Sequence, residues 1–240
     1  DGRLAGPQIY VTRLCKALDI NCKVFFPKSR SSIEFGNLLE KSGIHYSKVY
    51  MNRLSREPFR LLFYFLSFLP EILVLTVKFF FSKESIIYCA GGSWQIKAAI
   101  AGKLARKKVV WHLNDTFAPS FVLKVFNHLS FLANGYVHAS EATNKYYSKF
   151  LSQRPNLVAP APVDIDDFAK IKILEDLSSK STVTIGTVSN INPTKNLEDF
   201  IEIAAALNNE KFMNFRFVIY GPIFSSQKEY YKKLNKRIID

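Results

Sequence analysis

The sequence is poor in cysteine. Its three thiols, Cys15, Cys22 and Cys89, are odd in number and have no metal-like spacing. A disulfide framework and a zinc site are therefore not expected, and a reducing compartment is favoured. No His-Glu-x-x-His pattern is present either, so we predict no metal in the site. The first residues do not resemble a secretory leader and include no start methionine, so we expect a chain that is clipped at its start.

Three signatures of nucleotide and hydrolase chemistry are also missing. No stretch matches Gly-x-Gly-x-x-Gly, Gly-x4-Gly-Lys-Ser/Thr or Gly-x-Ser-x-Gly. These absences argue against a standard dinucleotide enzyme, a P-loop hydrolase and a hydrolase of the nucleophile-elbow type.

What the chain has in excess is positive charge. Its 240 residues are 48% hydrophobic and 14% aromatic, which excludes a disordered protein. There are 33 Lys and Arg against 20 Asp and Glu, a net charge of +13. All of the excess lies in residues 1–155, with 22 basic and 9 acidic side chains, whereas residues 156–240 hold 11 of each. Such an excess points to nucleic acid, an anionic membrane surface or phosphorylated small molecules.

Most of the chain alternates between two patterns. Short apolar runs rich in Val, Ile and Phe predict buried strands at 24–26, 86–89, 109–113, 136–139, 157–159, 183–188 and 215–220. Helical patterns lie at 7–18, 94–106, 120–132, 141–151, 197–207 and 227–239. This alternation predicts an α/β fold with parallel, doubly wound sheets.

The most apolar stretch is 61–81. Glu71 and Lys78 interrupt it, and Pro70 is expected to end or kink a helix. We therefore predict two short apolar helices and not a membrane span. They form either a buried core pair or an interfacial segment that dips into a membrane. Arg60 and two other arginines just before the stretch suit the second interpretation and also suit a solvated helix start.

A domain boundary is expected after residue 155. Three prolines, three aspartates and a Ser-Ser-Lys-Ser run follow each other there, and the charge balance changes at the same place. We predict a Rossmann-like domain over 1–155 whose first strand is missing, a linker over 156–181, and a second domain that starts at 182. Two strands and two helices do not close a doubly wound domain, so we expect the second domain to be truncated at 240.

Two loops are candidate phosphate sites. Gly6 and Pro7 precede the first helix, where backbone N–H groups can meet an anion. Lys195 lies between strand 183–188 and helix 197–207, with Asn196 as a plausible N-cap. Ligands of open α/β sheets bind at such strand ends. An ordinary glycine turn and a solvated lysine are the alternatives.

Polar residues also follow the predicted strand 109–113. His112 ends an apolar run, and Asn114 and Asp115 follow it, so all three can face the crevice at the strand end. His112 is either a sugar contact near the reacting centre or a core histidine bonded to backbone. Asn114 and Asp115 either hold substrate or cap the next helix. Gly91-Gly92 is a weaker signal, because glycine turns are common in this fold.

The order of these features resembles the retaining glycosyltransferases of family 4, which have the GT-B fold of two Rossmann-like domains. Gly6-Pro7-Gln8 resembles the loop that faces the donor diphosphate, and Trp111-His112 resembles the strand end that lines the sugar site. Lys195 matches the phosphate-binding lysine of a Gly-Arg-x5-Lys-Gly type motif. Ser140 resembles the serine that opens a helix, and Tyr220-Gly221-Pro222 resembles the turn after the next strand.

The resemblance implies a hexosyltransferase that uses a UDP- or GDP-sugar and retains the anomeric configuration. It implies His112 as the catalytic-site residue and Asn114, Asp115 and Ser140 as acceptor or sugar contacts. The implied donor contacts are Gly6, Asn190, Lys195 and Gly221. No cofactor is expected besides the donor co-substrate. The acceptor is a glycan or a lipid-linked glycan held by residues 1–155, in the cytoplasm or on the inner face of a membrane.

The sequence departs from the family pattern at several places. Asn190 replaces the arginine of the phosphate motif, Asn196 replaces its second glycine, and Ala161-Pro162 replaces an Asn-Gly pair. The Glu-x7-Glu segment that contacts donor sugar and ribose would lie beyond Asp240. We therefore expect a partial enzyme. The alternatives are another nucleotide-binding α/β enzyme, or a basic α/β module without catalysis that binds membrane or nucleic acid. Nucleic acid is the less favoured partner, because no Arg–aromatic recognition motif is present.

Overall fold

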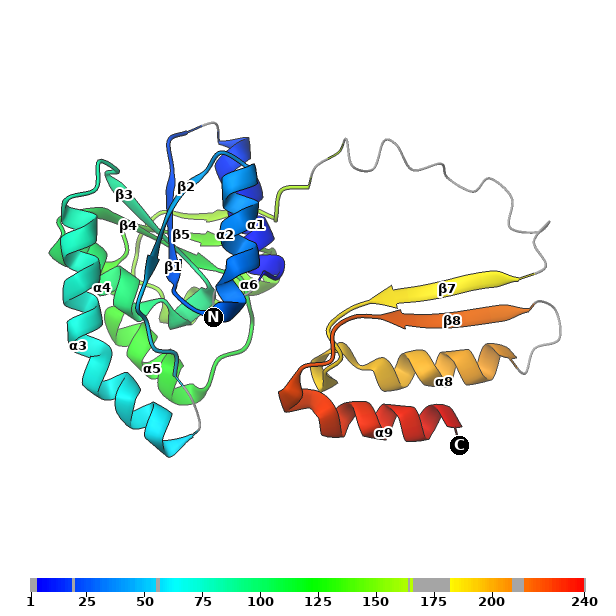
Figure 1. The fold of residues 1–240 in the computed structure, drawn as a ribbon. Coiled ribbons are helices and arrows are strands. Elements are labelled where there is room, and N and C mark those ends of the chain that lie inside the picture. The colour runs from blue at the N-terminus through cyan, green and yellow to red at the C-terminus, as the bar shows by residue number, and fades with distance from the viewer. Residues whose placement is uncertain are drawn as a thin grey trace. The chain divides into compact units, whose positions relative to one another are not determined.

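The computed structural model describes residues 4–18, 20–54, 57–163, 165, 182–208 and 214–239. The chain divides into two compact units, a first unit over Asp1–Phe168 and a second unit over Ala169–Asp240 (Figure 1). Each unit is built from parallel strands and helices.

The first unit alternates helix and strand. Its elements are α1 (Gly6–Ala17), β1 (Lys23–Pro27), α2 (Ile33–Lys41), β2 (His45–Val49), α3 (Pro58–Phe80), β3 (Ile86–Ala90), α4 (Ile96–Leu104), β4 (Lys108–Leu113), α5 (Ser120–Leu129), β5 (Gly135–His138), α6 (Glu141–Tyr147) and β6 (Asn156–Val158). β1 pairs with β2, and a four-stranded sheet has the order β3-β4-β5-β6. Every pairing is parallel, so the carboxyl ends of neighbouring strands lie at one edge.

The core of the first unit is centred on β4. Val109, Trp111 and Leu113 are fully buried on this strand, and His112 beside them is 2% exposed. A central parallel strand is covered on both faces, which explains its continuous apolar run. The ring of Trp111 meets Phe126 of α5 edge to face, and its indole N–H donates to the Gly92 carbonyl at 2.8 Å.

The second unit is smaller. It comprises β7 (Val183–Val188), α8 (Leu197–Asn208), β8 (Phe215–Tyr220) and α9 (Lys228–Ile239), and β7 pairs with β8 in parallel. Its core cluster is formed by Ile191, Leu197, Tyr230 and Leu234. The α/β class predicted from the alternating pattern is confirmed in both units.

Two elements escaped the sequence prediction. α2 and β2 were not predicted, because the segment 33–49 mixes charged residues with its apolar ones and gives neither a clean helical stripe nor an apolar run. β6 lies inside the predicted linker 156–181. It pairs with β5 and belongs to the first unit, and most of the remaining linker lies outside the described residues.

The prediction of two short helices over 61–81 is wrong. α3 is one helix of 23 residues with Pro70 inside it. Pro70 is exposed, so the Leu66 carbonyl that loses its amide partner can bind water. Of the two alternatives for this stretch, the buried core pair is wrong, since only 17% of the most apolar part of α3 is buried. By length and composition alone, α3 is apolar enough to cross a membrane.

Candidate functional site

The carboxyl edge of the four-stranded sheet gathers most of the candidate residues of the first unit. Ala90 of β3 pairs with His112 of β4, and Leu113 of β4 pairs with His138 of β5. The loops that leave these three strands therefore start side by side. Asn114 and Asp115 follow β4, and Ser140 follows β5.

His112 is held in an aromatic stack. Its ring lies 4.6 Å from the ring of Tyr10 and 5.5 Å from that of Tyr88, with interplanar angles of 19° and 28°. The two tyrosine hydroxyls are 3.1 Å apart and share a hydrogen bond. Tyr10 comes from α1 and Tyr88 from β3, so two elements far apart in sequence fix the orientation of one imidazole.

The imidazole of His112 is neutral at pH 7. Burial, together with the neighbouring His138, lowers the pKa of His112 from 6.5 to about 4, because a buried cation loses its hydration. Among the described residues, no group accepts from or donates to either ring nitrogen of His112, and the same holds for His138. The alternative of a core histidine bonded to backbone is therefore not what the structure has.

Asp115 is held against a glycine loop. Its carboxylate accepts a hydrogen bond from Tyr147 at 2.9 Å, and the Tyr147 hydroxyl also lies 3.3 Å from that of Ser93. A Cβ on Gly92 would come within 3.1 Å of both Asp115 carboxylate oxygens, and the φ of Gly92 is +71°. This position therefore requires glycine. Burial raises the pKa of Asp115, and its hydrogen bond from Tyr147 opposes that shift.

Asn114 and Asp115 do not cap the following helix. α5 begins at Ser120 and its N-cap position is Pro119, with no side-chain cap. A hypothetical Cβ on Gly92 would lie 3.3 Å from the Asn114 side-chain oxygen, so Asn114 joins Asp115 against the same loop.

Ser140 has a structural task. It is the N-cap of α6, and its hydroxyl accepts from the Thr143 amide at 3.2 Å. The Thr143 hydroxyl lies 3.0 Å from the Ser140 amide, which completes a capping box. The cap accounts for serine at this position without a substrate.

The start of α1 offers fewer amides to an anion than the sequence indicated. Pro7 has no N–H, and the amides of Gln8 and Ile9 both donate to the Ala5 carbonyl, at 3.0 and 3.1 Å. A Cβ on Gly6 would meet nothing within 4 Å, so the space beside this backbone is open.

The carboxyl edge of β7 and β8 gathers the candidates of the second unit. Lys195 ends a single 3₁₀ turn, Pro193–Lys195, directly before α8, and both Lys195 and Asn190 are exposed. Asn196 has a left-handed backbone with φ of +48°, and its side-chain amide donates to Asp199. The predicted N-cap role of Asn196, in which its oxygen accepts, is therefore replaced by a turn role that suits Asn or Gly.

Gly221 brings the two loops of this edge together. A Cβ on Gly221 would lie 1.7 Å from the Ser189 carbonyl oxygen, which no side chain can tolerate. The Ser189 amide donates to Tyr220 at 2.9 Å, and the Ile191 amide donates to Pro222 at 3.3 Å. Gly221 thus shapes the loop that carries Asn190.

The predicted residues other than Gly6 therefore lie at two sheet edges: His112, Asn114, Asp115 and Ser140 in the first unit, and Asn190, Lys195 and Gly221 in the second. The sequence reasoning missed Tyr10, Tyr88 and Tyr147, because their partners in the site are 24 to 102 residues away and no local pattern marks such pairs. In the part of the chain that the structure describes, no group of three or more His, Cys, Asp or Glu side chains could hold a metal.

A hollow of about 340 Å³ lies at the opposite edge of the four-stranded sheet. It is lined by strand starts such as Ile86, Lys108 and Asn156. Ligands of parallel sheets bind at the carboxyl ends, so this hollow is not the candidate site.

Comparison with known proteins rests on structure. The sequence matches no family model and no curated protein. HepE (Alr3699) from Anabaena, crystallised with UDP and glucose, is similar with a TM-score of 0.76 and 19% identity over 100% of this chain and 64% of that protein. The same protein with UDP-glucose gives a TM-score of 0.73 and 20% identity, again over 100% of this chain and 63% of its own.

Two further solved structures are similar to this chain. A glycosyltransferase from Rickettsia africae has a TM-score of 0.67 and 17% identity, and it covers 97% of this chain and 60% of its own. The lipopolysaccharide outer core galactosyltransferase WaaB, in its apo form, has a TM-score of 0.64 and 14% identity over 99% and 62%. The chain thus spans less than two thirds of the proteins it matches. Its fold is the α/β fold of the GT-B glycosyltransferases.

Proposed function

We propose that this protein is a glycosyltransferase that moves a hexose from a UDP- or GDP-sugar to a glycan or a lipid-linked acceptor, with retention at the anomeric carbon. The observation that carries the proposal is the fold likeness over the whole chain to HepE, a protein crystallised with UDP-glucose. The narrower assignment to family 4 and a cytoplasmic location belong to the same proposal.

Lys195 is proposed to bind the donor diphosphate. The bond between the sugar and the diphosphate breaks during transfer, so negative charge grows on the leaving phosphate, and a fixed cation there stabilises the transition state. The first turn of α8 carries Glu198 and Asp199, which counter the positive end of the helix dipole. Lys195 therefore bears more of this task than the helix start does, and Asn190 supplies a neutral hydrogen-bonding group in the same loop.

The first unit is proposed to hold the sugar and the acceptor. His112 is neutral at pH 7, and its buried ring nitrogens, which have no partner among the described residues, offer one donor and one acceptor once a sugar hydroxyl reaches them. Asn114 and Asp115 offer an amide and a carboxylate at the same sheet edge. No protein nucleophile, cofactor or metal is required by this scheme.

A nucleotide-sugar screen tests the donor. The melting temperature of the intact protein is measured with UDP-glucose, UDP-galactose, GDP-mannose and uridine alone. We expect one nucleotide sugar to raise it and uridine to have little effect. Lys195→Ala is expected to weaken donor binding about 10- to 100-fold, the range for a charge-assisted hydrogen bond.

Lys232→Ala is the matched control, because Lys232 is an exposed lysine on α9 of the same unit. It should bind donor like the parent. If no nucleotide sugar stabilises the protein, or if both lysine variants bind equally well, the proposed donor site is wrong. Retention is checked separately by NMR of the product anomer, and an inverted product would remove that part of the proposal.

A further inference from the structure

One side of α3 is a continuous apolar stripe. Its residues recur at spacings of three and four, so they line one side of the helix. Each is about half exposed or more: Phe59, Leu62, Phe63, Leu66, Leu69, Leu73, Val74, Val77 and Phe80. We call these nine residues the α3 stripe. Contiguous exposed apolar surface of this length marks an interaction site.

The other side of α3 is packed into the first unit. Ile72, Leu75 and Phe79 are buried in the same cluster as Trp111 and Val109. α3 therefore cannot cross a bilayer without withdrawing these side chains from the core. The helix is available to a partner along one side only.

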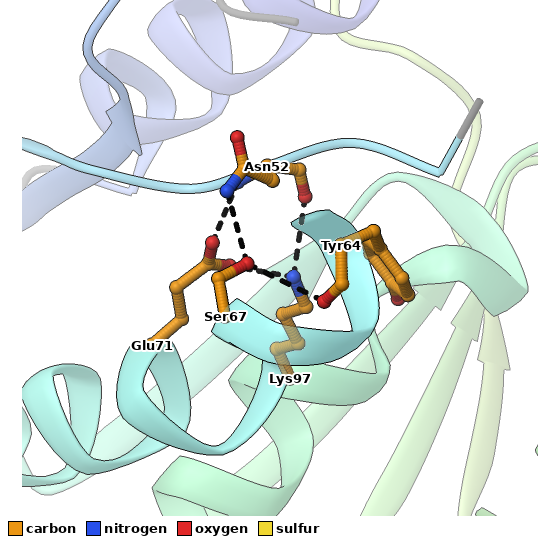
Figure 2. A network of polar contacts seen from close by, with 5 residues as sticks. All are labelled: Asn52, Tyr64, Ser67, Glu71 and Lys97. Carbon is orange, nitrogen blue, oxygen red and sulfur yellow. Dashed lines mark hydrogen bonds and ion pairs between the residues drawn. The ribbon is translucent and has the colours of Figure 1, made fainter. Parts of the chain in front are cut away.

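A polar network fixes this orientation (Figure 2). Lys97 of α4 pairs with Glu71 of α3, and the two are 4% and 6% exposed. Lys97 also donates to the Asn52 carbonyl at 3.2 Å, and its ammonium lies 3.9 Å from the ring centroid of Tyr64. The backbone N–H of Asn52 donates to the Glu71 carboxylate at 2.9 Å. The side-chain amide of Asn52 donates to the Ser67 hydroxyl, also at 2.9 Å.

The network explains how an apolar helix can carry a glutamate. Glu71 points into the protein and finds its cation there, so the α3 stripe contains no charge. Removing one partner of such a buried pair is strongly destabilising, which holds the helix in this rotation about its axis.

A basic flank runs beside the stripe. Arg60 and Lys78 are 18 residues apart, which is five helical turns, so they project from the same side of α3, about 27 Å apart. Both are exposed, and Lys83 follows shortly after the helix and is exposed too. Arg60 pairs with Glu57 at 2.9 Å, but both side chains are more than half exposed and such a pair holds little energy.

We propose that α3 docks this protein in the plane of an anionic phospholipid leaflet. The α3 stripe enters the boundary of the acyl chains, and Arg60 and Lys78 lie at the level of the headgroups. A leaflet complements both features at once, because acyl chains take the stripe and anionic headgroups take the flank. The excess of basic side chains in residues 1–155 adds a long-range attraction of the same sign.

Vesicle flotation tests the docking surface with the intact protein. Vesicles of phosphatidylcholine alone are compared with vesicles of equal parts phosphatidylcholine and phosphatidylglycerol. We expect binding to the anionic vesicles that weakens with salt. The double variant Phe63→Glu/Leu66→Glu should reduce binding about tenfold or more, because it places two charges in the acyl boundary. Arg60→Gln and Lys78→Gln should each reduce it about fivefold.

Matched controls separate docking from folding. Phe131→Glu/Leu157→Glu replaces two side chains of similar exposure, 58% and 60% against 62% and 66%, elsewhere in the first unit. Lys124→Gln/Lys145→Gln removes two exposed lysines from α5 and α6. Both control variants should bind vesicles like the parent. All variants should keep the circular dichroism spectrum of the parent.

A second readout does not depend on affinity. Phe63→Trp should be quenched by brominated lipids more strongly than Phe131→Trp, because only the first side chain enters the leaflet. The proposal is overturned if the parent does not bind anionic vesicles, or if the stripe and control variants bind equally. It is also overturned if the parent does not bind vesicles but forms an oligomer that the Phe63→Glu/Leu66→Glu variant dissociates. A second copy of the chain would then cover the stripe. None of these assays uses a nucleotide-sugar donor. Their outcome is therefore independent of the proposed glycosyltransferase activity.

Discussion

At the carboxyl edge of the four-stranded sheet, His112 is 2% exposed and stacks with two tyrosine rings, whereas at the carboxyl edge of β7 and β8 Lys195 is exposed. The first edge is built from buried side chains that bond to one another, as Asp115 does to Tyr147. The second edge is built from closely packed backbone, with Asn190 and Lys195 exposed.

The difference predicts how each edge responds to mutation. Buried groups at the first edge serve stability and orientation at once, so changes there should alter both folding and chemistry. Exposed groups at the second edge can be changed with little effect on folding. Only the close approach of the two loop backbones at Gly221 should be sensitive to substitution.

Gly221→Ala is expected to have the largest effect. The new Cβ would lie 1.7 Å from the Ser189 carbonyl oxygen, a backbone atom that can move only if the two loops separate. We expect the free energy of unfolding of the second unit to fall by about 3 kcal/mol. Urea unfolding and hydrogen exchange of β7 and β8 measure it.

Gly186→Ala in β7 is the control for this change. Its new Cβ would meet the nearest atom at 3.8 Å, an ordinary contact. It should leave stability within about 0.5 kcal/mol or raise it slightly. Equal effects of the two alanines would mean that the close approach at Gly221 does not hold this edge together.

The sequence predicted the elements that carry apolar runs and missed those that do not. β4 and β7 were predicted within a residue, β4 from the continuous apolar run of a buried parallel strand and β7 from its Val and Ile residues. α3 was misjudged because Pro70 and Glu71 were taken as interruptions. An exposed proline and a glutamate paired with Lys97, 26 residues away, remove both objections, and neither can be inferred without the fold.

The candidate site divides in the same way. Lys195 and Gly221 follow predicted strands and His112 lies near the end of one, so their place at a sheet edge could be expected from topology. The stacking of Tyr10 on His112 and the hydrogen bond from Tyr147 to Asp115 join distant segments, so they could not be expected from topology. Ser140 was predicted as a substrate contact, although Thr143, three residues later in the sequence, already allowed a capping box at the start of the helix.

Acid should destabilise the first edge through His112. The pKa of His112 is lowered from 6.5 to about 4 in the folded protein, so the unfolded chain binds a proton first as the pH falls. The stabilising contribution is full above 6.5 and is lost on the way down to about 4. We expect a loss of about 2 kcal/mol in the free energy of unfolding between about pH 7 and about pH 5.

The variant His112→Gln isolates this contribution. Its stability should change less over the same pH range, because Gln does not titrate. His138, whose pKa burial also lowers, and Asp115, whose pKa burial raises, remain in both proteins and cancel in the difference. Parallel pH profiles of the parent and the variant would contradict a buried neutral His112.

Ser140→Ala should have the smallest effect on stability that is still measurable, and it sets the two edges directly against each other. The change removes the acceptor for the Thr143 amide at the start of α6, so we expect a loss of about 1 kcal/mol in urea unfolding. Donor affinity should stay unchanged, because the hydroxyl is already bonded within the helix cap.

Lys195→Ala should show the reverse: weaker donor binding with stability within about 0.5 kcal/mol of the parent. Ser140→Thr, which keeps the capping oxygen, should restore most of the loss. If Ser140→Ala instead raises the KM for donor or acceptor while stability is unchanged, the serine serves the ligand, and the first edge resembles the second more than its buried side chains indicate.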